Sequence, residues 1–78
     1  MEELIDYIAR SLVDDPTQVD IRQWQRGPTT IFELSVAKED MGRVIGKGGR
    51  VATAIRMLLR VAAAREGAKA SLDIVDPE

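Results

Sequence analysis

The chain has 78 residues, of which 45% are hydrophobic and 31% charged, carries a formal net charge of −2, and contains neither cysteine nor histidine. This length is that of one small domain, and the hydrophobic fraction excludes a disordered chain. Because zinc is held mainly by thiolate and imidazole, an ordinary zinc site is excluded, as are Ser-His and Cys-His nucleophile pairs. The composition argues against an enzyme, so we expect no catalytic residues, no metal and no cofactor.

The N-terminus and the absence of cysteine bear on the cellular compartment. No apolar run approaches the ~20 residues of a membrane span. The chain starts with acidic residues (Glu2, Glu3 and Asp6), whereas a secretory signal starts with basic ones. A chain without disulfides is typical of a reducing compartment. We therefore expect a cytoplasmic protein that does not insert into membranes.

The first half of the chain predicts a helix followed by two strands. Apolar residues recur at helical spacing over residues 2–14, which predicts an amphipathic helix ending before Pro16. Apolar and polar residues alternate with a period of two over residues 19–26 and 30–37, which predicts strands. Gly27-Pro28 between them is typical of a turn, so the two strands form a hairpin.

The second half predicts two helices and a strand. Residues 38–45 form a short helical segment, the following glycines interrupt it, and residues 50–66 form the longest helix. Gly67 stands where a C-capping glycine belongs, and residues 69–75 alternate as a strand. The order is α-β-β-α-α-β, an α+β domain. The residues expected on the buried face of the longest helix are Val51, Ile55, Leu58, Leu59 and Ala62.

The charges separate along the chain. Residues 41–65 contain six basic and no acidic side chains, whereas the remainder carries a net charge of −8. Binding to a phosphate backbone is governed by the local basic patch and not by the total charge. The basic residues nearest the glycine segment are Arg43, Lys47 and Arg50. Those farther along, Arg56, Arg60 and Arg65, are more typical of a solvated helix surface.

The segment Gly46-Lys47-Gly48-Gly49 lies between two predicted helices and has G-x-x-G spacing. Glycines permit tight turns and close approach of a ligand, and the free N–H groups of a helix starting near Arg50 would attract an anion. A phosphate-binding Walker A loop is excluded because Gly48 occupies its Ser/Thr position, and a dinucleotide-binding loop because Val51 occupies its last glycine position. On these residues alone, a plain connection between two helices, with glycines for geometry only, is favoured over a binding loop.

The segment Val44-Ile45-Gly46-Lys47-Gly48-Gly49 resembles the signature loop of KH domains, in which a G-x-x-G turn clamps single-stranded nucleic acid. The order of elements resembles the type II KH arrangement. The resemblance covers the whole chain (1–78), as a single KH domain, and is closest to the small stand-alone bacterial proteins of the KhpA (YlqC) family, above all over residues 37–50. It implies a three-stranded mixed sheet with three helices packed on one face.

The resemblance also implies a function and a set of contacts. The chain would be a non-catalytic RNA-binding protein, an RNA chaperone that clamps the backbone of single-stranded RNA with its G-x-x-G loop. Val44 and Ile45 would support bases or belong to the core, and Gly48 stands where a polar residue is common in the family. The residues expected to bind RNA are Gly46, Lys47, Gly48, Gly49, Arg50, Arg43, Ile45 and Val44.

One clamp for about four nucleotides binds weakly and is sensitive to salt, so useful affinity requires a second domain. The resemblance implies a second KH protein of the KhpB (Jag or EloR) type as the partner, and a homodimer is the other arrangement. It links such proteins to cell elongation, division and peptidoglycan homeostasis.

Two alternatives remain. The first is a protein-interaction subunit with only incidental RNA contact, favoured by the small core and by Trp24, which lies on the opposite strand face from Val19 and Ile21. At Trp24 we expect packing or a protein contact rather than base stacking. The second is a helix-turn-helix DNA-binding domain that uses residues 50–66, against which the predicted strands count.

Overall fold

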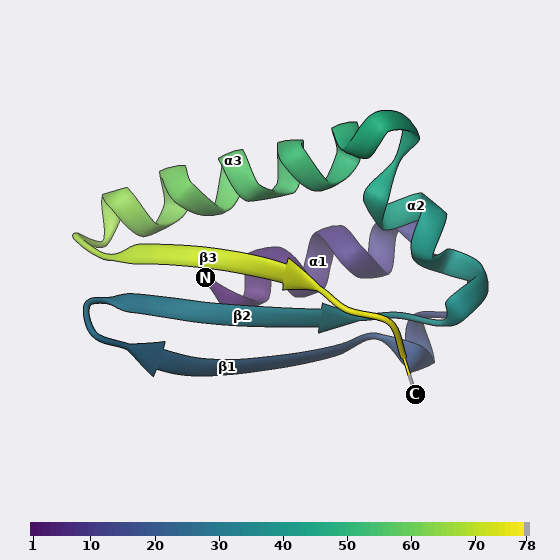
Figure 1. The fold of residues 1–78 in the computed structure, drawn as a ribbon, viewed down its shortest axis with the longest axis horizontal. Helices are drawn as coiled ribbons and strands as arrows, with labels where there is room; N and C mark the ends of the chain where they lie inside the picture. Colours follow the sequence, from purple (N-terminus) through teal and green to yellow (C-terminus); the bar gives the residue numbers. More distant parts are fainter. Residues whose placement is uncertain (78) are drawn as a thin grey trace.

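The structure is a computed structural model, and it describes residues 1–77. It contains three helices and three strands in the order expected, with short 3₁₀ turns between them (Figure 1). The principal elements are α1 (Glu2–Leu12), β1 (Asp20–Arg26), β2 (Thr29–Ser35), α2 (Met41–Ile45), α3 (Arg50–Arg65) and β3 (Lys69–Ile74).

The strands form one mixed sheet in the order β1-β2-β3. β1 and β2 are an antiparallel hairpin with Trp24 opposite Ile31, and β2 and β3 run parallel with Phe32 opposite Leu72. Two helices and their connection link the parallel strands, as a parallel pair requires. This confirms the expected α+β order and the mixed sheet.

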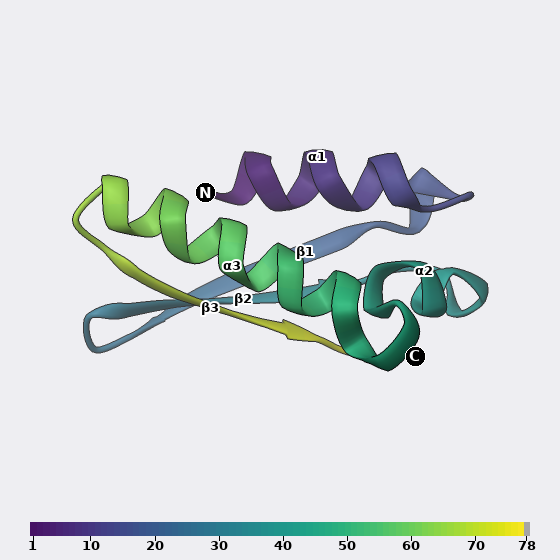
Figure 2. The ribbon, with the colours of Figure 1, turned by 90° about the horizontal axis from the view of Figure 1, so that it is seen from above.

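All three helices lie on one face of the sheet, with α1 and α3 side by side (Figure 2). Successive side chains of a strand point to opposite faces, and the face that carries Phe32 and Leu34 is the one buried against the helices. The residues that form this core are Ile5, Ala9, Phe32, Leu34, Val36, Val44, Ile55, Leu59 and Leu72. Within residues 1–77, no helix combines the length and the apolar character needed to cross a bilayer.

α3 ends as its sequence indicates. Gly67 has a φ of 69°. Its N–H donates to the carbonyl of Ala64, and the N–H of Ala68 donates to the carbonyl of Ala63. This pair of bonds is the Schellman motif, which requires the left-handed conformation that glycine adopts without strain. The expected C-capping role of Gly67 is confirmed.

The prediction for the buried face of α3 was wrong at one position, Leu58. Leu58 is 51% exposed, whereas Leu59 is 1% exposed. Consecutive helical residues point about 100° apart, and the sheet-facing side is centred on Ile55, Leu59 and Ala63, so the side chain of Leu58 points outward. The element boundaries also differ by one or two residues, and the expected helix over 38–45 starts with a 3₁₀ turn.

A buried carboxylate at the start of α2 ties the N-terminal segment to the rest of the fold. Asp40 is only 2% exposed, and its two oxygens accept the backbone N–H groups of Asp14 and Asp15, each at 3.1 Å. Arg43 Nε lies 3.4 Å from Asp40 Oδ1 and supplies the opposite charge. A buried carboxylate is tolerated because its oxygens are occupied in this way.

Replacing Asp40 with Asn should therefore destabilise the fold. The substitution turns an amide N–H₂ toward a backbone N–H and removes the charge that faces Arg43, at a cost of about 1–3 kcal/mol. Thermal denaturation followed by circular dichroism measures the effect. Glu39→Gln, the same chemical change on the exposed neighbour, should stay within about 0.5 kcal/mol of the parent protein. Equal melting temperatures for the two variants would contradict the anchoring role of Asp40.

Candidate nucleic-acid interface

The connection between α2 and α3 is built from glycines in the left-handed region. Gly46 ends α2 with a φ of 77°, and Gly48 and Gly49 have φ values of 65° and 76°. The N–H of Gly46 donates to the carbonyl of Gly42 at 2.8 Å, and the N–H of Gly49 donates to the carbonyl of Gly46 at 3.1 Å. Because three of the four residues from Gly46 to Gly49 have a positive φ, the chain turns sharply from one helix into the next.

Gly46 is required for a second, steric reason. A Cβ atom at this position would lie 2.4 Å from Val51 Cγ2 and 2.8 Å from the Val51 backbone nitrogen. Because backbone cannot move away as a flexible side chain can, no other residue fits without displacing the start of α3. At Gly48 and Gly49 a Cβ atom meets nothing within 4 Å, so these two positions are open to solvent.

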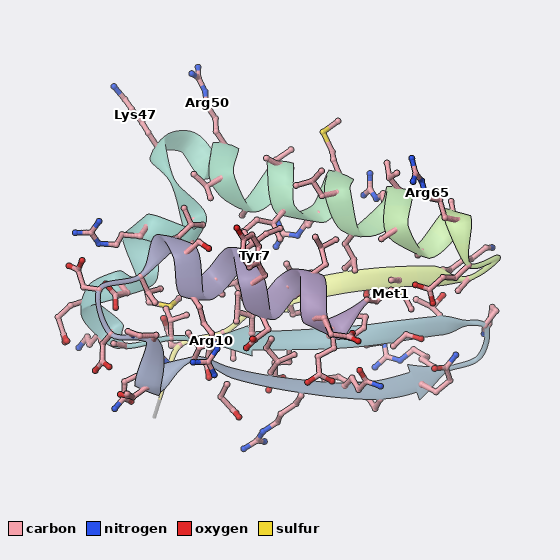
Figure 3. All side chains as sticks on the ribbon, turned by 180° about the vertical axis from the view of Figure 1, so that it is seen from behind. Met1, Tyr7, Arg10, Lys47, Arg50 and Arg65 are labelled. Atoms are coloured by element: carbon pink, nitrogen blue, oxygen red, sulfur yellow. The ribbon has the colours of Figure 1, made fainter. Side chains whose placement is uncertain are left out.

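The N-terminus of α3 faces the same space as the glycine loop. Its N-cap is Gly49, no side chain caps it, and its first turn contains no acidic residue. The backbone N–H groups of a first helical turn lack partners within the helix and form a positive end. Lys47 and Arg50 project from this end of the molecule into solvent (Figure 3). The N–H groups of Gly49 and Arg50 already donate to the carbonyls of Gly46 and Lys47, so this end offers an anionic ligand the rest of the first turn, its positive dipole and two cations.

The structure brings most, but not all, of the expected RNA-binding residues together. Ile45, at 37% exposure, lies beside the loop. Val44 is 0% exposed and belongs to the core, so of the two roles left open for it, the structure supports packing. Those that gather around the connection are Ile45, Gly46, Lys47, Gly48, Gly49 and Arg50.

Arg43 is occupied elsewhere. Its Nη2 donates to Asp14 Oδ2 at 2.9 Å, and its Nε lies 3.4 Å from Asp40 Oδ1. Two carboxylates therefore neutralise its charge and hold the guanidinium against the segment that follows α1. Asp14 lies 29 positions from Arg43 in the chain, whereas Asp40 lies only 3 positions from it. Only the contact with Asp14 depends on the tertiary fold.

Arg56 has a role that the spacing of basic residues did not predict. We expected a solvated side chain, but Arg56 is partly buried, and its Nε donates to the carbonyl of Leu72 at 3.1 Å. This bond joins α3 to β3, the strand at the edge of the sheet. One feature of the sequence is consistent with this role: Arg56 directly follows Ile55 and therefore lies at the border of the buried face of α3.

Comparison with known proteins identifies the domain. A family model described as the KH domain of KhpA/KhpB matches residues 2–74, which include every helix and strand described above. The chain belongs to this family. The KhpA resemblance drawn from the glycine loop and the order of elements is thereby confirmed.

Relatives in this family match along nearly their full length. The RNA-binding protein KhpA of Chlamydia trachomatis is 46% identical over 76 residues, which cover 97% of each chain. The RNA-binding protein KhpA of Clostridium perfringens is 45% identical over 75 residues, covering 96% of this chain and all of that one. That of Treponema pallidum is 47% identical over 75 residues, covering 96% and 94%.

The KhpA/KhpB-type fold also occurs within a larger solved protein. The crystal structure of Aquifex aeolicus Era superposes with a TM-score of 0.67 at 20% identity, covering 95% of this chain and 29% of the Era chain. At this identity the likeness concerns the fold alone, and it supports the α+β architecture described here.

Gly46→Ala should perturb both the stability and the loop of this KhpA/KhpB-family domain. The methyl group would collide with Val51 and enforce a left-handed alanine, so we expect a loss of about 1–3 kcal/mol in a denaturant titration. Gly42→Ala is the matched control, because Gly42 lies in α2, has no positive φ and leaves an added Cβ free of contacts. A Gly46→Ala variant as stable as Gly42→Ala would contradict the steric argument.

Proposed function

We propose that this chain binds single-stranded RNA, holding its sugar-phosphate backbone against the G-x-x-G loop and the N-terminus of α3. The observation that carries the proposal is the coincidence of open glycines, uncapped helix N–H groups and two free cations at one site of a KH-domain family member. Relatives at 45–47% identity are named RNA-binding proteins, which supports the same ligand class.

The geometry of the glycine loop suits contact with the sugar-phosphate backbone of RNA rather than recognition of a particular base sequence. Gly48 and Gly49 present main chain without side chains in the way, so a phosphate can approach their peptide groups closely. Lys47 and Arg50 are exposed side chains, and they add charge without a fixed orientation that would select particular bases. The exposed side chain of Ile45 offers an apolar contact to one base beside the loop. Sequence preference is therefore expected to be low.

Charge sets the strength of this binding. Because Arg43 is neutralised by Asp14 and Asp40, only Lys47 and Arg50 act directly at the loop. Two phosphate contacts predict a salt slope of about −1.4 in a plot of log affinity against log salt. This shallow slope corresponds to a weak, sequence-tolerant interaction, and a second RNA-binding domain would raise the overall affinity through effective concentration.

This mode of binding fits a non-catalytic RNA chaperone in the cytoplasm, which must hold and release many strands. The second domain would come from a KH protein of the KhpB type, and the process would be gene-expression control linked to cell elongation and peptidoglycan homeostasis. The matching family model covers the KH domain of both KhpA and KhpB, so a partner of the KhpB type would bring a second domain of the same family.

A second candidate function, a protein-interaction subunit, is favoured by one surface. Met57, Leu58 and Val61 are exposed apolar side chains on the outward side of α3, and Tyr7 on the neighbouring α1 is also exposed. We call these four residues the apolar helix surface. Apolar patches of this kind commonly mark contacts with other proteins. The apolar helix surface and the glycine loop involve different residues, so mutations can separate the two functions.

The central test is the double variant Lys47→Asp/Gly48→Asp. Aspartate tolerates the left-handed conformation, and both positions are exposed, so the fold should persist while two carboxylates repel the phosphates. We expect at least about a tenfold loss of affinity, equal to ~1.4 kcal/mol, for a fluorescein-labelled unstructured RNA in an anisotropy titration. Circular dichroism checks the fold.

The matched control is Arg65→Asp/Gly67→Asp at the other end of α3 (Figure 3). It makes the same change in charge and also replaces a left-handed, exposed glycine. RNA affinity should be nearly unchanged in this control. Equal losses in both variants would show general electrostatic attraction, and binding retained by a folded Lys47→Asp/Gly48→Asp variant would contradict the loop as the RNA site.

A further inference from the structure

The face of the sheet that lies opposite the helices is open. In Figure 1 this face is toward the viewer, with α1 behind the strands, and no helix lies in front of it. Phe32 and Leu72 point into the core, so their neighbours along β2 and β3 point to the open face. The strand register arranges the side chains of this face in rows that run across the sheet.

The charges on the open face separate along the strands. The two rows nearest the hairpin turn consist of Arg26, Thr29 and Lys69, and then of Trp24, Ile31 and Ser71. Neither row contains an acidic side chain, and within residues 1–77 neither Arg26 nor Lys69 has an ion pair. In the next row, by contrast, Arg22 lies 3.6 Å from Asp20 and stands opposite Glu33. The half of the face nearest the turn is therefore locally basic.

Trp24 is the aromatic side chain of this basic half. It stands directly opposite Ile31 in the register, and Ile31 is only 8% exposed although no helix covers its side of the sheet. Directly opposed side chains pack against each other, so the indole covers Ile31 and is held in place by it. Trp24 nevertheless remains 40% exposed, and this exposed part of the ring is available to a ligand beside two free cations.

We infer that this half of the open face is a second contact for the RNA strand, where a base stacks on Trp24 and phosphates lie against Arg26 and Lys69. We call these three residues the sheet platform. A single strand alternates flat bases with negative charges, and an aromatic ring beside unpaired cations is complementary to that alternation. Stacking accepts any base, so the sheet platform adds affinity without adding sequence preference.

The structure favours RNA over a protein at this face. Trp24 is the one large apolar side chain exposed on the described strands, so a protein partner would bury little apolar surface there. From the sequence alone, packing or a protein contact is expected at Trp24. The register changes that expectation because it places Lys69, which comes from a distant part of the chain, in the same row as Arg26.

The inference rests on the proposed function, because the sheet platform is too weak to hold a strand alone. One stacked base raises affinity by roughly 5- to 150-fold, whereas even millimolar binding requires about 1,000-fold. A strand already held at the glycine loop meets the sheet platform at a high effective concentration. The sheet platform therefore acts only on RNA long enough to reach both places.

The required length follows from the size of the molecule. The α2–α3 connection and the hairpin turn lie at opposite ends of it (Figure 1), and its longest extent is 35 Å. At the ~3.4 Å per nucleotide of a stacked strand, about twelve nucleotides exceed this extent and about four do not. A strand of about four nucleotides thus contacts the loop alone, and one of about twelve contacts both sites.

The fluorescence of Trp24, the only tryptophan in the chain, reports this contact directly because a stacked base quenches indole emission. Unstructured RNA of about twelve nucleotides should quench it, and RNA of about four, the length of the loop site, should not. The longer strand should also show a salt slope steeper by about 1.4, since two more phosphates are neutralised.

Variants separate stacking from packing. Trp24→Leu keeps an apolar side chain over Ile31 but removes the ring, so we expect at least about a fivefold loss of affinity for the longer RNA and none for the shorter. Trp24→Phe keeps a ring and should retain most of the affinity. Anisotropy titrations with both lengths measure these effects, and circular dichroism checks the fold.

The cations have a matched control on the same face of β1. Arg26→Gln should weaken binding of the longer RNA and reduce its salt slope by about 0.7. Arg22→Gln makes the same chemical change two residues away, where Asp20 and Glu33 already oppose the charge, and should do neither. Equal losses in the two variants would show general attraction and overturn the inference.

Two further results would overturn it. The first is a folded Trp24→Leu variant that binds the longer RNA as tightly as the parent protein, which would leave Trp24 as a packing residue or a protein contact. The second is an equal loss for both lengths, which would place the effect at the loop. Failure of the proposed function differs from these, because the shorter RNA would then bind equally well to the Lys47→Asp/Gly48→Asp variant.

Discussion

The close contact between Gly46 and Val51 determines how the candidate site is built. The chain leaves α2 so near to the backbone of Val51 that no side chain fits at Gly46, and this closeness sets where α3 begins. Val44 on one side of the turn and Ile55 on the other are buried in the same core, so both helices are fixed to the sheet. The glycines between them therefore face water, and with them the uncapped N–H groups of α3.

Carboxylates decide which cations are available to a ligand. Of the three basic residues nearest the loop, Arg43 is held by Asp14 and Asp40, so its role is to join the segment after α1 to α2. Lys47 and Arg50 have no ion pair within the described chain and project into solvent. A net acidic protein can thus offer a local basic site, while its acidic remainder limits non-specific attraction to nucleic acid.

The sequence predicts the elements well because their signals are local. Helical and strand periodicity, the turn at Gly27 and the cap at Gly67 each depend on residues close together in the chain. The spacing of the loop, with its family resemblance, also indicates where a binding site is expected. The errors arise where partners are distant. Asp14 neutralises Arg43 across 29 positions, Leu72 engages Arg56 across 16, and the direction of the sheet decides that Leu59 rather than Leu58 is buried.

The most direct test of the proposed RNA contact is an ¹⁵N–¹H NMR titration of the uniformly labelled protein with an unstructured oligonucleotide of about four nucleotides, the length that one such clamp accommodates. Backbone amides report the contact residue by residue, and the six glycines give separate signals in the loop and outside it. The account predicts the largest shifts at the amides from Gly46 to Val51, with Gly27 and Gly67 unchanged. Shifts confined to β1 or to the apolar helix surface, with the loop amides unmoved, would contradict it.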